Sequence, residues 1–215
     1  MLVKAIVYDL DGTLVNSAQI VIEILNRMRV ERGLEPLPLE RYIPWMSVGG
    51  IEMIRNALDE SDPDAIKKDL SRFRQSYIEM PTPNESIYSG VRDVLKYLSN
   101  KGYQLGVCTN KPRVLVDKIM SETGLGEFFS FIQAGGDIPV KKPHPDTLKL
   151  CISNLESNHI NTLMVGDSTV DQRLAINCKT DFVFFSNGYD DGVDRSKVKA
   201  TICEHQQIID YIRIR

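Results

Sequence analysis

The sequence predicts an α/β fold: a doubly wound, Rossmann-like parallel sheet with an all-helical segment inserted after its first strand. Residues 2–8 form a short, largely apolar and β-branched run, which is typical of a buried parallel strand. From Gly90 onward, helical patterns alternate with short apolar runs, which indicates parallel strands joined by helices on both faces of a sheet. Between these two parts, residues 16–84 carry helical patterns and no convincing strand.

The alternating part of the chain supplies the elements that such a sheet needs. Helices are expected at 91–100, 113–123, 146–155, 170–177 and 206–212, and strands at 104–108, 131–134, 162–165, 182–185 and 200–203. In the inserted part, helices are expected at 19–28, with Ser17 as a possible N-cap, at 51–58 and at 63–80. The predicted domains are an α/β catalytic core of residues 1–15 and 85–215 and a helical cap of residues 16–84.

Length and composition restrict the class of protein. A chain of 215 residues is long enough for one α/β domain with an insertion. A net charge of -3, without a dense block of lysine and arginine, argues against nucleic acid as a partner. We expect no membrane span, because no apolar run approaches the necessary length, and no signal peptide, because the first residues lead directly into a strand. The four cysteines are far apart and form no Cys-x-x-Cys pair, which favours reduced thiols in a cytoplasmic protein over zinc or disulfides.

Two aspartates follow the first predicted strand. Asp9 and Asp11 fall at its carboxyl end, in a turn that Gly12 permits. In open α/β sheets the crevice beyond the strand ends is where ligands bind. Two carboxylates held there repel each other unless they share a cation or a proton. These residues alone indicate a metal site, a catalytic pair or both, and an ordinary acidic turn is the structural alternative.

Polar residues also follow the strand expected at 104–108. Thr109 and Asn110 place a hydroxyl and an amide at a strand end beside a helix start, which suits an anion but is also typical of a helix cap. Lys142 precedes Pro143 in a stiff loop, although adjacent lysines in a loop are often only solvated. These positions are candidates for binding an anion.

A second pair of acids follows the strand expected at 162–165. Asp167 and Asp171 are four residues apart at a helix start, so their carboxylates point roughly the same way. Both could be simple N-terminal acids that the helix dipole stabilises. Together with Asp9 and Asp11 they would make a crevice of hard oxygen ligands, which selects magnesium.

These four groups resemble, in order, the four motifs of the haloacid dehalogenase superfamily of phosphohydrolases. The first is Asp9-Leu10-Asp11-Gly12-Thr13, and the others are Thr109-Asn110, Lys142-Pro143 and Gly166-Asp167-Ser168-x-x-Asp171. The resemblance implies phosphoryl transfer through an aspartyl-phosphate, with Asp9 as the nucleophile and Asp11 as the general acid and base.

The resemblance also implies roles for the remaining residues. Magnesium would be held by Asp9, Asp167 and the backbone carbonyl of Asp11. The phosphoryl oxygens would be bound by Thr109, Asn110 and Lys142, and Asp171 would orient a metal-bound water or the lysine. The helical cap would close over the site and exclude water.

Several stretches look most like phosphoglycolate phosphatases. They are residues 109–112, 135–137 with 141–146, and 187–189, and residues 48–50 resemble the substrate-specificity loop of that group, with Gly49 and Gly50 letting backbone approach a ligand. A plain helix start explains these glycines nearly as well.

The substrate expected from this resemblance is a small phosphorylated metabolite, with 2-phosphoglycolate first. Relatives with the same stretches act on pyrophosphate, nucleotides or sugar phosphates, and a sugar-phosphate mutase shares the same core. A catalytically idle metabolite-binding relative is the alternative of another class, although no expected catalytic residue is missing. The chain could be a monomer or a homodimer, and we expect His159 and His205 to be exposed.

Overall fold

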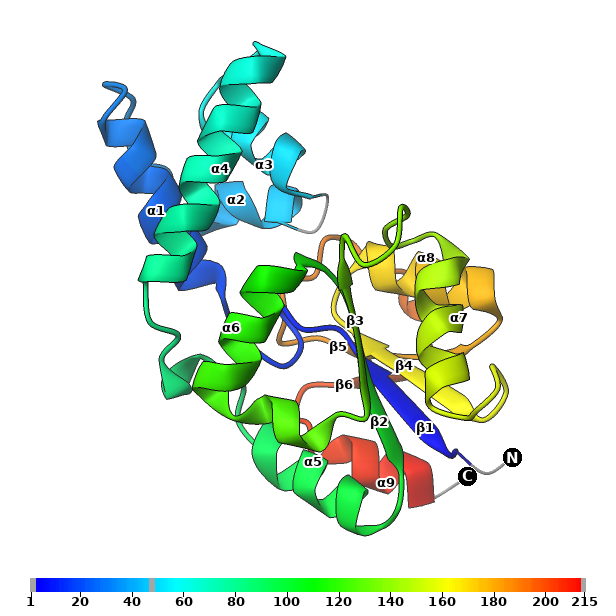
Figure 1. Cartoon of the computed structure of the whole chain (residues 1–215). Coiled ribbons are helices and arrows are strands. Elements are labelled where there is room, and N and C mark those ends of the chain that lie inside the picture. The colour runs from blue at the N-terminus through cyan, green and yellow to red at the C-terminus, as the bar shows by residue number, and fades with distance from the viewer. Residues whose placement is uncertain (1–2, 47–48, 214–215) are drawn as a thin grey trace. The chain divides into compact units, whose positions relative to one another are not determined.

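The computed structural model describes residues 3–46 and 49–213. Contacts between α-carbons divide the chain into two compact units. The core unit comprises Met1–Asn16 and Pro83–Arg215, and the helical unit comprises Ser17–Thr82. The α/β fold class predicted from the sequence is confirmed in the core unit, which Figure 1 shows as a twisted sheet with helices packed on it.

The sheet is parallel throughout the described residues. Its strand order is β3-β2-β1-β4-β5-β6. The bounds are β1 Ala5–Tyr8, β2 Gln104–Pro112, β3 Phe131–Gly135, β4 Thr162–Gly166, β5 Asp181–Phe185 and β6 Ala200–Ile202. β1 lies between β2 and β4, and all four of its residues are buried, as expected for an apolar strand inside a parallel sheet.

Helices cover both faces of this sheet. In the core unit they are α5 Val91–Asn100, α6 Arg113–Thr123, α7 Pro145–Asn154, α8 Thr169–Cys178 and α9 Gln207–Arg213, with short 3-10 turns η1 Asn84–Ser86, η2 Leu125–Phe128 and η3 Arg195–Lys197. Figure 1 shows α7 and α8 on one face and α5, α6 and α9 on the other. Strand β2 continues to Pro112, beyond the predicted end at residue 108, because Pro112 still pairs with Gly135 after a shift in register.

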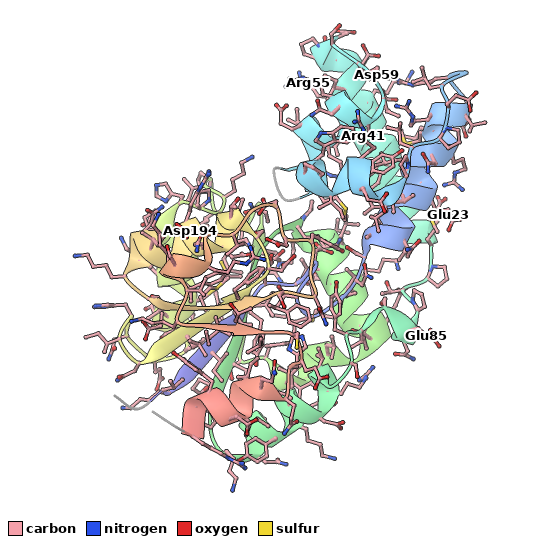
Figure 2. All side chains as sticks on the ribbon, turned by 180° about the vertical axis from the view of Figure 1, so that it is seen from behind. Glu23, Arg41, Arg55, Asp59, Glu85 and Asp194 are labelled. Atoms are coloured by element: carbon pink, nitrogen blue, oxygen red, sulfur yellow. The ribbon has the colours of Figure 1, made fainter. Side chains whose placement is uncertain are left out.

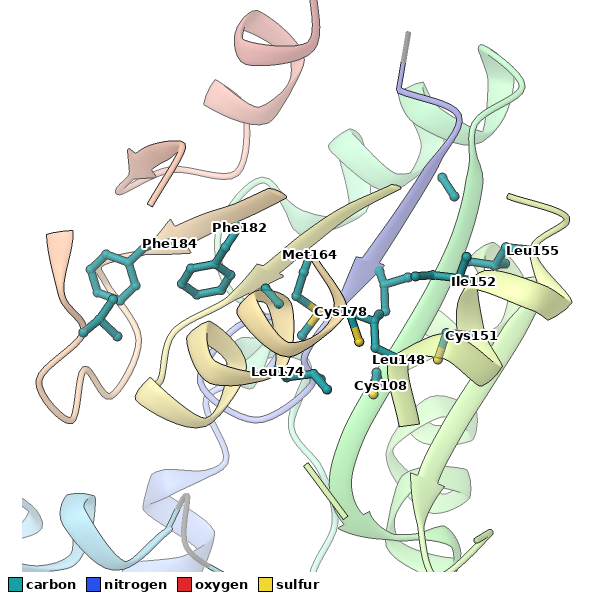
Figure 3. Close-up of a cluster of buried hydrophobic side chains, with 14 residues drawn as sticks. Cys108, Leu148, Cys151, Ile152, Leu155, Met164, Leu174, Cys178, Phe182 and Phe184 are labelled. Carbon is teal, nitrogen blue, oxygen red and sulfur yellow. The ribbon is translucent and has the colours of Figure 1, made fainter. Parts of the chain in front are cut away.

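The face under α7 and α8 holds a dense apolar cluster. Figure 3 shows it, with Cys108 and Met164 from the sheet packed against Leu148, Cys151 and Leu174 from the helices. Burial of such side chains is the main favourable contribution to folding. The four cysteines are free thiols, three of them buried, as the spacing in the sequence indicated.

The helical unit is a bundle with its own buried residues. Its helices are α1 Ala18–Val30, α2 Leu39–Met46, α3 Gly50–Ala57 and α4 Pro63–Glu79. Asp62 caps α4, and its carboxylate accepts from the N–H groups of Asp64 and Ala65. Ser17 stands at the N-cap position of α1, but its side chain makes no capping hydrogen bond. Helix α2 was not delimited from the sequence, because Pro44 lies inside it.

Charged side chains are distributed over the surfaces of both units. Figure 2 shows Glu23, Arg55 and Asp194 among them, and each of these three is exposed. Among the described residues, none of the helices combines the length and the apolarity needed to cross a bilayer.

One prediction about a histidine is wrong. His205 is 1% exposed, against the expectation of an exposed side chain, whereas His159 is exposed. The His205 ring packs against Phe185, and its Nε2 lies 2.8 Å from the carbonyl oxygen of Thr13. Because a carbonyl oxygen can only accept, Nε2 carries the proton and donates it. Burial lowers the pKa of His205 to about 4, so the ring is neutral at neutral pH.

Candidate active site

The candidate residues come from the carboxyl ends of three neighbouring strands. Asp9 follows β1, Thr109 lies in the last part of β2, and Asp167 follows β4. Because the three strands are adjacent and parallel, these residues share one edge of the sheet. Lys142 reaches the same place from the loop between β3 and α7. The core unit alone therefore assembles the four motifs.

Three acids and one lysine form a buried group that we call the inner cluster: Asp9, Asp167, Asp171 and Lys142. Carboxylate oxygens of the three acids all lie within 4.8 Å of one another. The Nζ of Lys142 lies 2.8 Å from Oδ1 of Asp9 and 2.7 Å from Oδ1 of Asp171. None of the four residues is more than 8% exposed. Charges this deeply buried persist only when they are paired.

The main chain of Lys142 is held by an amide. The Nδ2 of Asn110 donates to the carbonyl oxygen of Lys142 at 3.1 Å, and the N–H of Lys142 donates to Oδ1 of Asn110 at 2.7 Å. Burial by itself lowers the pKa of Lys142, but the carboxylates of Asp171 and Asp9 outweigh it and raise this pKa above its ordinary value. The lysine is therefore a fixed cation.

Asp167 is fixed through both of its oxygens. The hydroxyl of Thr13 donates to Oδ1 at 2.7 Å, and the backbone N–H of Tyr189 donates to Oδ2 at 2.8 Å. The backbone at residues 12 and 188 can approach the Asp167 side chain this closely only because Gly12 and Gly188 lack side chains. A Cβ at Gly12 would lie 2.1 Å from Oδ2 of Asp167, and one at Gly188 would lie 2.3 Å from its Cβ. Gly12 also has φ +80, a conformation that other residues rarely adopt.

Asp171 belongs both to the cluster and to the start of α8. Its Oδ2 accepts from the hydroxyl of Ser168 at 2.7 Å and from the backbone N–H of Ser168 at 3.2 Å, while its own N–H donates to the serine hydroxyl. This reciprocal arrangement is a capping box. One carboxylate oxygen thus stabilises the helix start, and the other is left to contact Lys142.

The carboxylates of the inner cluster fit a cation. Burial and the charge of Asp171 raise the pKa of Asp9 to about 7, although Lys142 opposes this. Burial and the charges of Asp171 and Asp9 raise the pKa of Asp167 well above its ordinary value, against the hydrogen bonds from Tyr189 and Thr13. A divalent cation would offset the mutual repulsion that adds to the effect of burial in both shifts, and hard carboxylate oxygens are the ligands that magnesium prefers.

Asp11 lies outside this cluster and pairs with a second lysine. Its Oδ1 and Oδ2 lie 3.0 and 3.3 Å from Nζ of Lys111, and we call these two residues the outer pair. The side chain of Asp11 is 25% exposed and that of Lys111 is 7% exposed. Within the described residues, the three carboxylates grouped as a possible metal site do not include that of Asp11. The expected metal contact through its backbone carbonyl stays a prediction.

The remaining candidates have different surroundings. Thr109 is 2% exposed, and its hydroxyl accepts from the N–H of Lys111 at 3.1 Å, so its own proton can be donated to an anion. The Asn110 amide contacts the main chain of Lys142, which favours a role in positioning this lysine. A direct contact between Asn110 and phosphate stays a prediction.

The glycines expected to form a substrate loop lie in the helical unit. Gly49 has φ +119 and precedes α3, and Gly50 is the first residue of that helix. A Cβ at Gly50 would lie 2.8 Å from Cδ1 of Leu70, so packing within the bundle already explains this glycine. Val48, the other member of the proposed loop, lies outside the described residues.

Three residues near the carboxylates had no role assigned from the sequence. Lys111 lies in the stretch of residues 109–112, but nothing in the sequence indicated its ion pair with Asp11. Tyr189 acts through its backbone N–H, which carries no residue-specific signal. Burial raises the pKa of Tyr88, and the charges of Asp167 and Asp11 add to this increase.

Comparisons with known proteins agree with this arrangement. The family model described as haloacid dehalogenase-like hydrolase matches residues 6–185. A phosphoglycolate phosphatase of Cereibacter sphaeroides is 32% identical over 188 residues, which cover 86% of this chain and 85% of the relative. One of Pectobacterium atrosepticum is 27% identical and covers 98% and 92% of the two chains.

A solved structure agrees with the comparisons of sequence. The crystal structure of a "predicted phosphoglycolate phosphatase" from Haemophilus somnus 129PT superposes with a TM-score of 0.88. The two proteins are 26% identical, and the match covers 97% of each chain. The chain therefore belongs to the haloacid dehalogenase-like hydrolases, and within them to the phosphoglycolate phosphatase-like proteins.

Proposed function

We propose that the protein is a magnesium-dependent phosphatase that hydrolyses a small phosphate monoester, with 2-phosphoglycolate as the leading substrate. The observation that carries this proposal is the inner cluster. In it, a buried carboxylate at the end of the central strand lies 2.8 Å from a fixed lysine and beside two further acids. The similarity to phosphoglycolate phosphatases supports the choice of substrate.

In the first step, a carboxylate oxygen of Asp9 attacks phosphorus in line with the ester oxygen. A phosphorus–oxygen bond to Asp9 forms and the ester bond breaks, giving an aspartyl-phosphate. Asp11 gives its proton to the departing alkoxide, which leaves as an alcohol. Lys142 holds Asp9 in place and supplies positive charge to the equatorial oxygens, with Thr109 as a second donor.

In the second step, water hydrolyses the aspartyl-phosphate. Asp11, now a carboxylate, takes a proton from the water as it attacks phosphorus. The bond between phosphorus and Asp9 breaks, so the products are inorganic phosphate and the original carboxylate. Asp9, Asp167 and the carbonyl of Asp11 would hold magnesium, whose positive charge would neutralise the facing anions.

The helical unit and the cellular setting complete the proposal. Residues 17–82 would serve as the cap that excludes water, with Gly49 in the segment that selects the substrate. A cytoplasmic location is supported by the three buried free thiols, which persist in a reducing compartment.

The test is phosphate release from a panel of compounds, with and without magnesium. The panel contains 2-phosphoglycolate, pyrophosphate, nucleoside monophosphates and sugar phosphates, and Asp9→Asn serves as the matched variant. We expect the fastest release from 2-phosphoglycolate, none without a divalent cation and none from Asp9→Asn. If another ester releases phosphate fastest and Asp9→Asn abolishes that release, the proposed mechanism stands but the proposed substrate is wrong. If no compound releases phosphate, the proposal is refuted.

A further inference from the structure

The candidate site contains two lysines whose side chains are largely shielded from solvent and contact different acids. Lys142 contacts Asp9 and Asp171, whereas Lys111 contacts Asp11. The side chain of Lys111 is 7% exposed, although the residue lies at the end of a strand where a lysine could readily extend into solvent. Holding an ammonium group away from water costs free energy, so its place beside Asp11 calls for an explanation.

The main chain holds Lys111 at this place. Its N–H donates to the hydroxyl of Thr109 at 3.1 Å, and Pro112 follows it in the last part of β2. The end of β2, which presents the candidate phosphate-binding hydroxyl of Thr109, therefore also fixes the main chain of Lys111. Its ammonium group lies 3.0 and 3.3 Å from the two oxygens of Asp11.

The proposed role of Asp11 indicates what lies next to Lys111. A group that gives its proton to the leaving oxygen must lie within a hydrogen bond of that oxygen, about 2.7 Å. The ammonium group of Lys111 is one further contact away. It is therefore placed beside the leaving group, whereas Lys142 is placed beside the nucleophile.

We propose that Lys111 selects substrates whose leaving group carries a carboxylate close to the ester oxygen. In 2-phosphoglycolate a single methylene carbon separates the carboxylate from that oxygen, so an ammonium group next to Asp11 can bind it. Without this ammonium group, the carboxylate of the substrate would face Asp11 and Asp9 and be repelled. This inference rests on the proposed function, because it assumes that Asp11 serves the leaving oxygen.

The test compares two substrates that differ only in this group. 2-Phosphoglycolate carries the carboxylate, and 2-hydroxyethyl phosphate carries a hydroxymethyl group in its place. The kcat and KM of both are measured for the wild type, Lys111→Met and Lys111→Arg. Lys118→Met is the matched control, because the side chain of Lys118 is also nearly buried, at 9% exposed, and pairs with Glu122 on α6.

We expect Lys111→Met to lower the ratio of kcat/KM for 2-phosphoglycolate to kcat/KM for 2-hydroxyethyl phosphate by about 10- to 100-fold. Most of this loss should be a higher KM for 2-phosphoglycolate. Lys111→Arg should restore part of the ratio, because it keeps the charge, and Lys118→Met should leave the ratio at the wild-type value. Because the ratio compares two substrates on one preparation, partial misfolding of a variant cannot imitate this result.

Other results would overturn the inference. An equal fall in kcat for both substrates in Lys111→Met would mean that the lysine only positions Asp11. If Lys111→Met leaves the ratio of the two kcat/KM values unchanged, or if the wild type hydrolyses both esters equally well, Lys111 does not select the carboxylate. Either result would leave the proposed phosphatase activity intact. A wild type that hydrolyses no phosphate ester would refute the proposed function itself.

Discussion

The inner cluster and the outer pair both place aspartates in contact with a lysine, but they differ in how deeply the carboxylates are buried and in how many contacts hold them. In the inner cluster, Lys142 is 4% exposed and contacts two carboxylates, and each of the three acids accepts further hydrogen bonds. In the outer pair, Lys111 contacts Asp11, whose side chain is 25% exposed. The inner groups are fixed by their surroundings, while the outer carboxylate remains open to solvent.

This difference matches the work proposed for each group. A nucleophile and its metal ligands need fixed positions, and their repulsion is acceptable where a cation binds. A residue that gives and then takes a proton must contact the leaving alcohol first and the water afterwards, so its carboxylate has to stay accessible. Buried charge should therefore contribute to both stability and activity in the inner cluster, and mainly to activity in the outer pair.

The largest effect should follow loss of the inner lysine. Lys142→Met leaves two buried carboxylates without their cation, and breaking a buried pair in this way costs about 3 to 5 kcal/mol. We also expect kcat/KM to fall by about a thousandfold or more, because the transition state loses a fixed positive charge. Urea unfolding without magnesium and phosphate release measure the two effects.

Lys111→Met is the matched comparison for that variant. Its partner Asp11 is partly solvated, so we expect a loss of only about 1 kcal/mol in the free energy of unfolding. Equal destabilisation by the two substitutions would mean that the distinction between the inner cluster and the outer pair is wrong.

The fold was predictable because its signals are local and repeated. The apolar strand at the start and the alternation after Gly90 give the parallel sheet. Helix α2 was harder to delimit, because Pro44 interrupts its pattern. The burial of His205 could not be predicted, because its partner Thr13 is 192 residues away in sequence.

The sequence was enough to predict which residues at the strand ends form the site, but not which contacts these residues make with one another. Asp9, Asp167 and Lys142 could be named because each stands in a recognisable motif. The pairing of Lys111 with Asp11 depends on how the end of β2 meets the segment that follows β1, and a sequence alone does not carry this information. Nor does it reveal that the Asn110 amide contacts the main chain of Lys142.

A smaller effect concerns a buried group that stays neutral. The His205 ring contacts the backbone carbonyl of Thr13, and the hydroxyl of the same threonine donates to Asp167. His205 is therefore connected to the inner cluster through Thr13. Its pKa is about 4 in the folded protein, below the ordinary value of 6.5. The unfolded chain therefore binds more protons between these two values, and the stability that the neutral ring provides is lost as the pH falls from 6.5 towards 4.

The size and origin of this loss can be measured by urea unfolding across that pH range. The shift corresponds to at most about 3 kcal/mol. His205→Gln should make the stability less dependent on pH, because its amide can donate to Thr13 without titrating, whereas His159→Gln at an exposed position should not. If His205→Gln loses stability on acidification as steeply as the wild type, then carboxylates of the inner cluster, not His205, cause the acid sensitivity.

A last effect separates the inner cluster from the outer pair by their affinity for magnesium. A ligand that binds only the folded protein stabilises it by about 2.7 kcal/mol at one hundred times its Kd, which raises the Tm by several degrees. We expect this increase in the wild type and its loss in Asp167→Asn, which removes a negatively charged oxygen from the inner cluster. Asp11→Asn should keep the increase, because the proposed contact uses its backbone carbonyl and its side chain pairs with Lys111.

Potassium chloride at matched ionic strength is the control for this measurement, because screening by salt alone would raise the Tm of all three proteins alike. If Asp11→Asn lost the increase in Tm and Asp167→Asn kept it, the metal would bind the side chain of Asp11, and the roles proposed for the inner cluster and the outer pair would be reversed. If only Asp167→Asn loses it, the inner cluster holds the metal. The side chain of Asp11 is then available to pair with Lys111 and to transfer the proton in the proposed reaction.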